Sequence, residues 1–297
     1  MKFKCDRQKL FQAASNASRA ALAKSSVPAL EGVLIKADKG AVSVTGFDLE
    51  LGITSSIETN ISESGSIVVG ARLLCDILRK LDSELVEFTC DKSLIVLIKG
   101  GKSEFTLQGI SSSEYPEMPT VPAEDAVKIP GCSLKGMIDQ TLFAVSQNEQ
   151  KPVHTGSLFE VSEGALTVVS VDGFRLAMRK EKASTGKDIS FVVPGKTLSD
   201  ISKMIEEDDT DAVISVGKKH VVFEFGGYTI TSRLLEGNFL DYKSTIPSSS
   251  TTTVTVKTRE FCDSIDRTSL LITDRLRSPL KIDFEEGIIK ISCVTSV

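Results

Sequence analysis

The sequence predicts an α+β protein built from tandem copies of one domain, in which helices pack on antiparallel strands. Landmarks recur along it at a near-constant distance. A Gly-Phe pair followed by a charged residue and a leucine occurs at Gly46 and again at Gly173, 127 residues later. Gly-Gly hairpin signals begin at Gly100 and Gly226, which are 126 residues apart. Self-similarity at a fixed period is the signature of repeated units, so the chain is predicted to contain copies of one domain.

Apolar residues at helical spacing predict five helices, over residues 6–22, 71–81, 133–146, 197–205 and 259–269. Each carries one inward-facing anchor, and successive anchors are 64, 60, 64 and 63 residues apart: Leu10, Leu74, Leu134, Leu198 and Phe261. A short helix with one apolar stripe is stable only when it packs on a sheet or on another helix. The repeating unit is therefore predicted to be a strand, a helix and about three more strands. Two such units form a domain whose two helices share one side.

Runs rich in β-branched and aromatic residues, bounded by turn signals, predict the antiparallel strands. They fall at 33–37, 41–45, 49–58, 66–69, 85–90, 94–99, 103–108, 157–161, 165–171, 212–216, 221–225, 228–234, 280–284 and 288–294. The Asp172-Gly173 pair between two such runs predicts a tight hairpin turn. Asp6 is predicted to cap the first helix, because a carboxylate there accepts a hydrogen bond from an unpaired backbone N–H.

Two polar segments predict the domain boundaries. Residues 110–130 hold four prolines, and residues 243–253 are rich in serine and threonine, as linkers are. The predicted domains are residues 1–120, 121–247 and 248–297. The third has only one unit, and a half-built domain leaves apolar surface and a strand edge open. Either another chain or missing sequence is expected to cover that surface.

Composition indicates a soluble globular protein. The chain has 297 residues, 41% of them hydrophobic and 25% charged, and a formal net charge of −5. It contains no apolar run of the roughly 20 residues that cross a bilayer, and its N-terminus scatters charge where a signal peptide would be apolar. A cytoplasmic protein without a membrane partner is expected. Six well-separated cysteines and two histidines predict no metal and no cofactor.

Catalytic patterns are incomplete. The segment from Pro194 to Thr197 reads Pro-Gly-Lys-Thr, but Ser190 stands where a phosphate-binding loop needs its first glycine. His154 and Asp172 could form a hydrolase triad with Ser157 or Ser170, although no nucleophile-elbow motif supports it. The prediction is a non-enzymatic protein. A small-molecule hydrolase that depends on His154 and Asp172 is kept as an alternative.

Charge is unevenly distributed. Residues 7–30 contain four basic residues and no acidic one, in a chain where acids outnumber bases 40 to 35: Arg7, Lys9, Arg19 and Lys24. A basic stripe on an acidic protein fits a polyanion that meets one surface only. A merely solvated helix face would give the same pattern, so charge alone leaves both interpretations open.

Five motifs, in this order and spacing, carry a resemblance that runs over essentially the whole chain. They are the segments 27–30 (Val-Pro-Ala-Leu), 45–50 (Thr-Gly-Phe-Asp-Leu-Glu), 114–116 (Glu-Tyr-Pro), 172–177 (Asp-Gly-Phe-Arg-Leu-Ala) and 236–242 (Glu-Gly-Asn-Phe-Leu-Asp-Tyr). In these the sequence resembles the bacterial sliding clamps, the beta subunits of DNA polymerase III. The resemblance implies tandem clamp domains with helices on an inner face and sheets on an outer face. Two subunits would join head to tail as a ring around duplex DNA. Clamps of this family continue for another unit, so the resemblance also implies that this sequence is truncated or fragmentary and lacks the C-terminal half of its third domain.

The resemblance also implies sites, residue by residue. Sequence-independent DNA contacts fall on Lys24, Arg72, Asn148 and Lys151, and outward helix faces add Arg7, Arg79, Lys80, Lys196 and Lys203. The peptide pocket, expected between the second and third domains, falls on His154, Val171, Gly173, Phe174, Arg175, Leu176 and Leu240. The dimer interface falls on Phe105, Leu107, Leu270 and Leu271.

The implied peptide partners are the polymerase III alpha subunit, the clamp loader and other clamp-binding proteins. The chain departs from the family at several of these positions. Pro152 and Val153 replace two aromatic residues, Leu240 stands where proline is usual, and Ser244 and Thr245 stand where basic and apolar residues occur. A monomeric peptide-binding scaffold that no longer closes a ring is the second alternative.

Overall fold

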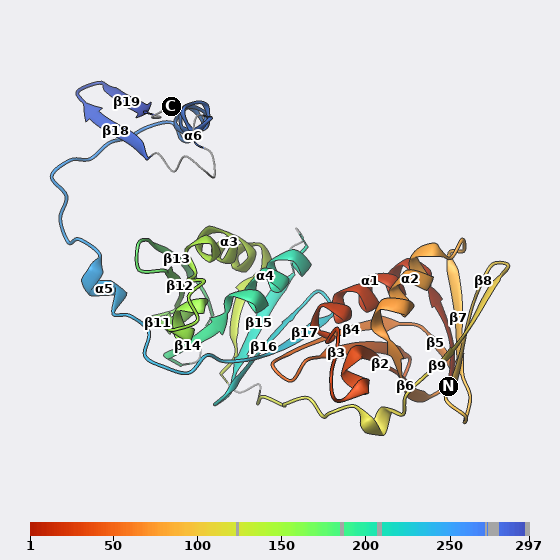
Figure 1. Ribbon diagram of the computed structural model, residues 1–297. Coiled ribbons are helices and arrows are strands. Elements are labelled where there is room, and N and C mark those ends of the chain that lie inside the picture. The colour runs from red at the N-terminus through yellow and green to blue at the C-terminus, as the bar shows by residue number, and fades with distance from the viewer. Residues whose placement is uncertain (123–124, 185–186, 207–209, 271, 273–278, 295–297) are drawn as a thin grey trace. The chain divides into compact units, whose positions relative to one another are not determined.

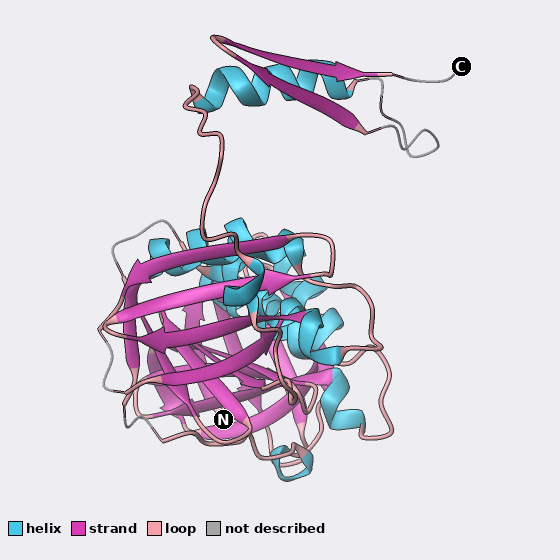
Figure 2. Cartoon of the chain, turned by 90° about the vertical axis from the view of Figure 1, so that its left-hand side faces the viewer, coloured by secondary structure: helices cyan, strands magenta, loops and turns pink. Residues whose placement is uncertain are grey.

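A computed structural model describes the chain except residues 123–124, 185–186, 207–209, 271, 273–278 and 295–297 (Figure 1). It divides into two compact units, which are described separately: an N-terminal unit, Met1–Leu240, and a C-terminal unit, Asp241–Val297. The N-terminal unit contains two halves of the same construction. Figure 1 shows its helices α1 to α4 along one side of the sheets, and Figure 2 shows the strands in magenta and the helices in cyan.

The first half runs from β1 to β9. Its helices are α1 (Arg7–Ala17) and α2 (Ala71–Lys80), with 3-10 turns at Ser18–Ala20, Pro28–Glu31 and Ser112–Glu114. Its strands are β1 (Lys2–Asp6), β2 (Gly32–Asp38), β3 (Ala41–Phe47), β4 (Leu51–Glu58), β5 (Asn60–Glu63), β6 (Gly65–Gly70), β7 (Leu85–Cys90), β8 (Ile95–Gly100) and β9 (Ser103–Gln108). One sheet of this half has the order β5-β1-β7-β8-β9.

The second half runs from β10 to β17. Its helices are α3 (Gly131–Thr141) and α4 (Gly195–Met204), with 3-10 turns at Leu142–Ala144 and Pro152–Thr155. Its strands are β10 (Val127–Pro130), β11 (Gly156–Ser162), β12 (Ala165–Val171), β13 (Leu176–Lys182), β14 (Ile189–Pro194), β15 (Asp211–Val216), β16 (His220–Phe225) and β17 (Tyr228–Arg233). One sheet of this half has the order β13-β12-β11-β14.

A third sheet joins the two halves. Its order is β10-β15-β16-β17-β4-β3-β2-β6, so four strands of the second half continue into four strands of the first. The junction is the antiparallel pair β17 and β4, in which Tyr228 faces Ser55 and Ile230 faces Ile53. The order β1-β7-β8-β9 in the first half matches β10-β15-β16-β17 in the second, and β6-β2-β3-β4 matches β14-β11-β12-β13. The predicted repeat of a helix-plus-strands unit is therefore confirmed within this unit.

Each half buries its own hydrophobic core between helices and sheets. One core includes Leu10, Leu74 and Phe88, and the other includes Leu134, Leu198 and Phe223. Helix α1 begins where predicted, because the Asp6 carboxylate accepts a hydrogen bond of 2.8 Å from the Lys9 N–H. Its buried face is mostly alanine, which lets the helix lie close to strands β3 and β4.

Several elements differ from the sequence predictions. Helix α1 ends at Ala17 and continues as a 3-10 turn, whereas a helix to residue 22 was predicted. Strands β1, β5 and β14 were missed, β13 was predicted only as the second run of the Asp172 hairpin, and β10 lies in the predicted linker 110–130. Strand β5, Asn-Ile-Ser-Glu, has only one apolar residue, too few for an alternation to be recognised. The predicted hairpin at Asp172 exists, but β12 and β13 pair through Val171 and Leu176, so residues 172–175 form the turn.

The C-terminal unit is small. It contains the single-turn helix α5 (Tyr242–Thr245), helix α6 (Thr258–Ser269) and the hairpin of β18 (Leu280–Glu285) and β19 (Ile288–Cys293). No described residue of α6 is fully buried, and the helix packs against β19 alongside a hollow of about 500 Å³ lined partly by Phe261, Ile289 and Ile291. The predicted domain limits, at 120/121 and 247/248, stay predictions. Among the described residues, no helix is long and apolar enough to span a membrane.

Gly46 permits the close approach of α1 to the sheet. A Cβ atom at this position would overlap with the backbone carbonyl oxygen of Ala17, the last residue of α1. Backbone atoms yield little, so we expect Gly46→Ala to lower the free energy of unfolding by about 1–3 kcal/mol, an overpacking cost. Gly70→Ala is the matched control, because an added Cβ there meets no atom within 4 Å. Thermal unfolding followed by circular dichroism measures both, and equal melting temperatures for the two variants would contradict this account.

Candidate functional site

The helix side of the N-terminal unit carries cations that are available for a ligand. Lys24 lies between the two 3-10 turns that follow α1, Arg72 is in the first turn of α2, Lys80 in its last turn, and Lys203 in the last turn of α4. All four side chains are exposed, and none forms an ion pair with a residue that the structure describes. Sequence analysis predicted all four as DNA contacts. The structure places them on the helices or just after one, and their role as DNA contacts stays a prediction.

Two other predicted DNA contacts already have intramolecular partners. The Arg7 guanidinium donates hydrogen bonds of 3.0 Å from Nε to the Ser83 carbonyl and from Nη1 to the Leu78 carbonyl. It therefore satisfies the Leu78 carbonyl in the last turn of α2, as cations at helix C-termini do, and a second carbonyl just beyond the helix. Arg79 lies 3.4 Å from the Asp76 carboxylate, and its guanidinium lies 5.6 Å from the Phe11 ring centroid. These contacts hold both arginines to the first half.

Lys196 and Arg19 connect the two halves. The Lys196 ammonium, at the start of α4, lies 3.5 Å from Oδ2 of Asp48, while Oδ1 of Asp48 caps the turn between β3 and β4. Arg19, in the 3-10 turn after α1, donates a hydrogen bond of 3.2 Å to Asp200 of α4. Of the four cations in the basic stripe, Arg7 and Arg19 are thus engaged within the protein. Lys9 and Lys24 form no ion pair with a described residue.

A hollow of about 690 Å³ brings predicted DNA contacts and predicted peptide contacts together. Asn148 and Lys196 line it beside Phe174 and Arg175, and the aromatic ring of Phe143 completes one wall. Asn148 accepts a hydrogen bond of 3.0 Å from the Gln150 N–H, which shapes the exposed loop before the 3-10 turn at Pro152–Thr155. Lys151 lies in the same loop but not in the wall of this hollow.

The turn Asp172–Arg175 is held by one carboxylate. Oδ1 of Asp172 accepts hydrogen bonds of 3.0 Å from the N–H groups of Phe174 and Arg175, and its Oδ2 lies 2.8 Å from Nε of Arg175. These hydrogen bonds, that of the Phe174 N–H above all, lower the pKa of Asp172. The Arg175 guanidinium also lies 5.4 Å from the Phe143 ring centroid, a cation–π contact. Arg175 is thereby held at the rim while Phe174 remains 99% exposed.

The other predicted peptide contacts are not in this hollow. Val171 is only 2% exposed, so its side chain belongs to the core, and it pairs with Leu176 across the turn. The His154 ring meets the Phe239 ring edge-on at 5.4 Å, and burial together with the nearby Lys151 cation lowers the pKa of His154. Leu240, the last residue of the N-terminal unit, is exposed. Gly173 has a φ of +90°, which the tight turn requires.

The predicted dimer residues divide between the two units. Phe105 and Leu107 lie on β9, the edge strand of the five-stranded sheet, and both pack partly against the core of the first half. Leu270 directly follows α6 and is 80% exposed. Leu271 lies outside the described residues.

The alternative hydrolase triad is not assembled. Oγ of Ser157 and Oγ of Ser170 lie 2.7 Å apart, both fully buried, and they hydrogen-bond to each other. The Asp172 carboxylate is committed to its own turn and to Arg175. Among the described residues, no hydrogen bond links His154 to this carboxylate or to either serine. These residues therefore lack the contacts between nucleophile, base and orienting acid that a triad requires.

Sequence analysis missed three groups that the structure brings to the site. Phe143 fell within the predicted helix 133–146 and was given no role, because no pattern distinguishes an exposed aromatic residue there from a buried one. Asp48 was recognised only as part of a motif, although it holds Lys196. The Asn16 amide donates a hydrogen bond of 3.0 Å to the Tyr228 hydroxyl across the two halves, a pairing of residues too far apart in sequence to be predicted.

The two halves of the N-terminal unit each match a family model. Residues 1–119 match the N-terminal domain of the DNA polymerase III beta subunit, and residues 128–241 match its central domain. The chain belongs to the DNA polymerase III beta subunit family. It is 35% identical over 292 residues to the beta sliding clamp of Bacillus subtilis, covering 95% of this chain and 77% of that protein. It is 32% identical over 303 residues to the beta sliding clamp of Staphylococcus aureus, covering 98% and 80%.

Solved beta subunits have the same fold. The crystal structure of the Bacillus subtilis DNA polymerase sliding clamp aligns with a TM-score of 0.92 at 33% identity, covering 100% of this chain and 83% of that one. A putative DNA polymerase III beta subunit from Eubacterium rectale aligns with a TM-score of 0.91 at 32% identity and the same coverage. The clamp of Pseudomonas aeruginosa, solved with bound griselimycin, aligns with a TM-score of 0.89 at 26% identity. The predicted α+β clamp fold is confirmed.

The Asp172 turn should make the stability of the protein depend on pH. Its lowered pKa means that the charged carboxylate stabilises the folded state above the ordinary value of 3.8. This contribution is lost as the pH falls through the lower pKa of the folded state. We expect Asp172→Asn, which keeps an acceptor for the two N–H groups, to lower the melting temperature at neutral pH.

The difference in melting temperature from the parent should shrink as the pH falls below 3.8. Asp91→Asn is the control, because Asp91 also caps a turn, through the Ser93 and Ile95 N–H groups, but forms no ion pair with a described residue. Thermal scans at several pH values measure both variants. A melting-temperature difference for Asp172→Asn that does not change with pH would refute the role of the charge.

Proposed function

We propose that the chain is a DNA polymerase processivity factor: a sliding clamp that encircles duplex DNA and tethers the replicative polymerase to it. In this role it is a non-catalytic, cytoplasmic subunit. The observation that carries the proposal is the match to two successive clamp domains in a chain whose helices present exposed cations on one side. A ring holds DNA topologically and needs no groove contacts, so an acidic protein with net charge −5 can do this.

The DNA contacts are proposed to be made with backbone phosphates by the exposed cations Lys24, Arg72, Lys80 and Lys203. The loop residues Asn148 and Lys151 contribute from the second half. Contacts to phosphates carry no sequence information, so the protein can slide. We propose that three further cations chiefly fix the shape of this surface, because each is already bound to an intramolecular partner: Arg7, Arg79 and Lys196. They still add positive potential near it.

Ring closure is proposed to repeat a junction that the chain already contains. Strand β17 ends the second half and pairs with β4, and by position in the repeat β9 is the equivalent of β17. The edge of β9, with Phe105 and Leu107, is thus a strand edge suited to pairing with a second copy. We propose a head-to-tail homodimer in which this edge meets the region of Leu270 and Leu271 in the second copy; the equivalence supports the role of the β9 edge, and the resemblance to the family supplies the other side.

Partner peptides are proposed to bind near the turn Asp172–Arg175. Phe143 and Phe174 supply exposed apolar surface, and Arg175 stands at the rim with its geometry set by Asp172. Short peptides anchored by leucine or phenylalanine suit such a wall. The expected partners are the polymerase III alpha subunit, the clamp loader and other clamp-binding proteins. His154, Leu176 and Leu240 are proposed to extend the peptide contact, with Val171 supporting it from the core.

Topological retention tests the proposed function. The protein, loaded onto nicked circular duplex DNA by its clamp loader, should stay with the circle during gel filtration and be lost when the circle is cut. A ring can leave a linear end, whereas a protein bound by direct contact cannot tell the two forms apart. Light scattering on the same sample should give a dimer. A monomer that still binds the alpha-subunit peptide would favour the scaffold alternative, and equal retention on both DNA forms would refute the clamp.

The salt dependence of DNA binding tests the phosphate contacts. Arg72→Gln and Lys24→Gln should each weaken binding to a short duplex equally for all sequences. Each should reduce the slope of log affinity against log salt by about 0.9, the contribution of one phosphate contact. Fluorescence anisotropy at several salt concentrations gives the slopes. Lys92→Gln is the matched control. Lys92 is an exposed lysine in the turn between β7 and β8, just after Thr89 of β7, which pairs with Lys2 of β1. The same slope change in that variant would contradict the assignment.

A further inference from the structure

The segment 110–122, the strap, lies between β9 and β10 and crosses from the first half to the second. Figure 1 shows it in yellow, on the side of the sheets away from helices α1 to α4. It begins at β6, an edge strand of the eight-stranded sheet, where Ile110 and Val68 form a β-bridge. Beside this bridge the Ser66 hydroxyl donates a hydrogen bond of 2.8 Å to Oγ of Ser112. The strap is therefore attached to the first half from its start.

A tyrosine anchors the next part of the strap on β3. Tyr115 is only 7% exposed, and its hydroxyl donates a hydrogen bond of 3.2 Å to the Thr45 carbonyl. The Tyr115 ring packs in a small core with four residues of the first half: Ala29, Leu30, Phe47 and Val68. Three of the five motifs in the sequence, 27–30, 45–50 and 114–116, thus meet at this point. Together they hold the strap against the sheet.

The remainder of the strap passes over β4 and reaches the second half. Met118 lies against Gly52 of β4, so closely that a Cβ atom on this glycine would overlap with the methionine methyl group. Val121 lies beside Gly217, in the turn between β15 and β16, where an added Cβ atom would be 3.3 Å from the valine side chain. The strap therefore crosses the line along which β4 and β17 pair.

Prolines make the strap stiff. They stand at every third position, as Pro116, Pro119 and Pro122. Proline fixes φ and favours the extended polyproline II conformation, in which a chain acts as a semi-rigid spacer. The six residue steps from Tyr115 to Val121 cover about 19 Å in that conformation. The four strand spacings from β3 to β15 also amount to about 19 Å. The strap thus spans the junction only when it is extended.

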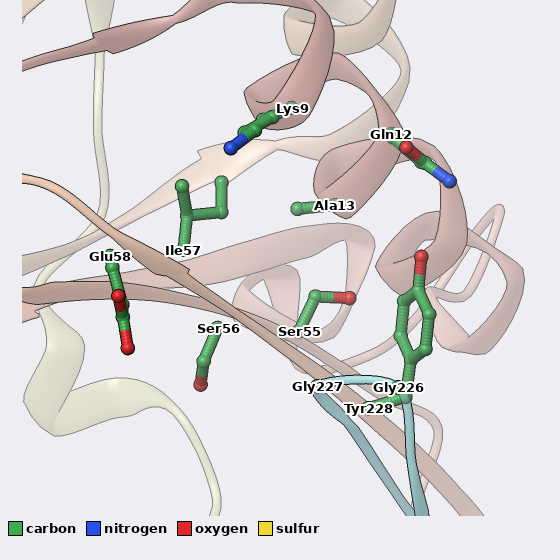
Figure 3. Close-up of a pocket in the computed structure, with 10 residues that line it drawn as sticks. All are labelled: Lys9, Gln12, Ala13, Ser55, Ser56, Ile57, Glu58, Gly226, Gly227 and Tyr228. Atoms are coloured by element: carbon green, nitrogen blue, oxygen red, sulfur yellow. The ribbon is translucent and has the colours of Figure 1, made fainter. Parts of the chain in front are cut away.

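The helix side of the junction is less closely packed. A hollow of about 390 Å³ lies there between α1, β4 and the β16–β17 turn, and Figure 3 shows Gln12 and Tyr228 facing it from the two halves. Polar side-chain contacts cross the junction on this side, such as the hydrogen bond from Asn16 to Tyr228.

Main-chain pairing alone leaves the orientation of the halves variable, because neighbouring strands tolerate a twist of about 10 to 35°. Contacts on the helix side oppose a rotation that opens that side. Contacts of the strap, on the other side, oppose the reverse rotation. The β17–β4 junction is thus held from both faces.

We propose that the strap fixes the relative orientation of the two halves, with Met118 as a positioning residue. A fixed orientation lets two copies close a ring, so this second effect rests on the proposed function. Closure needs the right orientation in both copies. When the suitably oriented fraction of chains falls to about a third, the dimer dissociation constant rises about 10-fold.

Distance measurements on the full chain test the orientation. Spin labels carried by unnatural amino acids replace two exposed residues, Asn60 in the first half and Lys180 in the second, and pulsed electron paramagnetic resonance gives the distribution of distances between them. Met118→Ala should broaden or displace this distribution. Met137→Ala is the matched control, because Met137 is fully buried in the core of the second half. Its loss should lower the melting temperature and leave the distribution as in the parent.

Pro119→Gly tests the stiffness of the strap. It removes no hydrogen bond, because proline has no N–H to donate, and it should also broaden the distribution. The proposal is overturned if neither strap variant changes the distribution, or if Met137→Ala changes it as much.

Light scattering over a concentration series tests the effect on the ring. Both strap variants should raise the dimer dissociation constant about 10-fold. Broadened distributions with unchanged dimer affinity would refute the link to ring closure. A parent chain that stays monomeric would refute the ring itself, and the distances would still decide whether the strap fixes the orientation.

Discussion

The pairing of β17 with β4 is the constraint on which the rest of the N-terminal unit depends. It converts two similar halves into one body with a continuous eight-stranded sheet, and it does so with main-chain hydrogen bonds that any sequence can form. Side chains then fix the register, since Ile230 and Ile53 face each other across the junction and both are fully buried. A slip of one residue would move these side chains to the opposite face of the sheet.

Polar contacts between the helices and the opposite half surround this junction. Arg19 reaches Asp200, Lys196 reaches Asp48, and Asn16 reaches Tyr228. The Asp200 and Asp48 carboxylates are largely buried in these pairs, and the contacts orient α1 and α4 relative to each other. The same contacts pair Arg19 and Lys196 with carboxylates of the protein, so these two cations are less available to a ligand. The basic surface is therefore made by the remaining lysines and arginines, and its pattern is set by the junction.

Sequence periodicity predicted the helices and most strands, because anchors such as Leu74 and Leu198 recur with the repeat and are buried where expected. Exposed cations such as Arg72 were also predictable, since an outward position on a helix follows from its apolar stripe. Arg7 was not, because only the fold brings the end of α2 beside it. The roles of Asp48 and Phe143 depend in the same way on neighbours that are distant in sequence. Predicted contacts in the C-terminal unit, such as Leu270, are not tested by its geometry alone.

Because the strand order is repeated, the sheet edges formed by β9 and β13 are complementary to each other. The edge of β9 corresponds to the strand that donates the junction, and the edge of β13 corresponds to the strand that receives it. Copies that join by such unlike edges add in one direction, and whether they close into a circle or grow into a helical fibre is decided by the turn at each junction. Small errors in that angle accumulate around the circle. Residues at the β17–β4 junction must therefore set the angle between the two halves as well as stabilise them, and a measurement of folding stability alone does not report that angle.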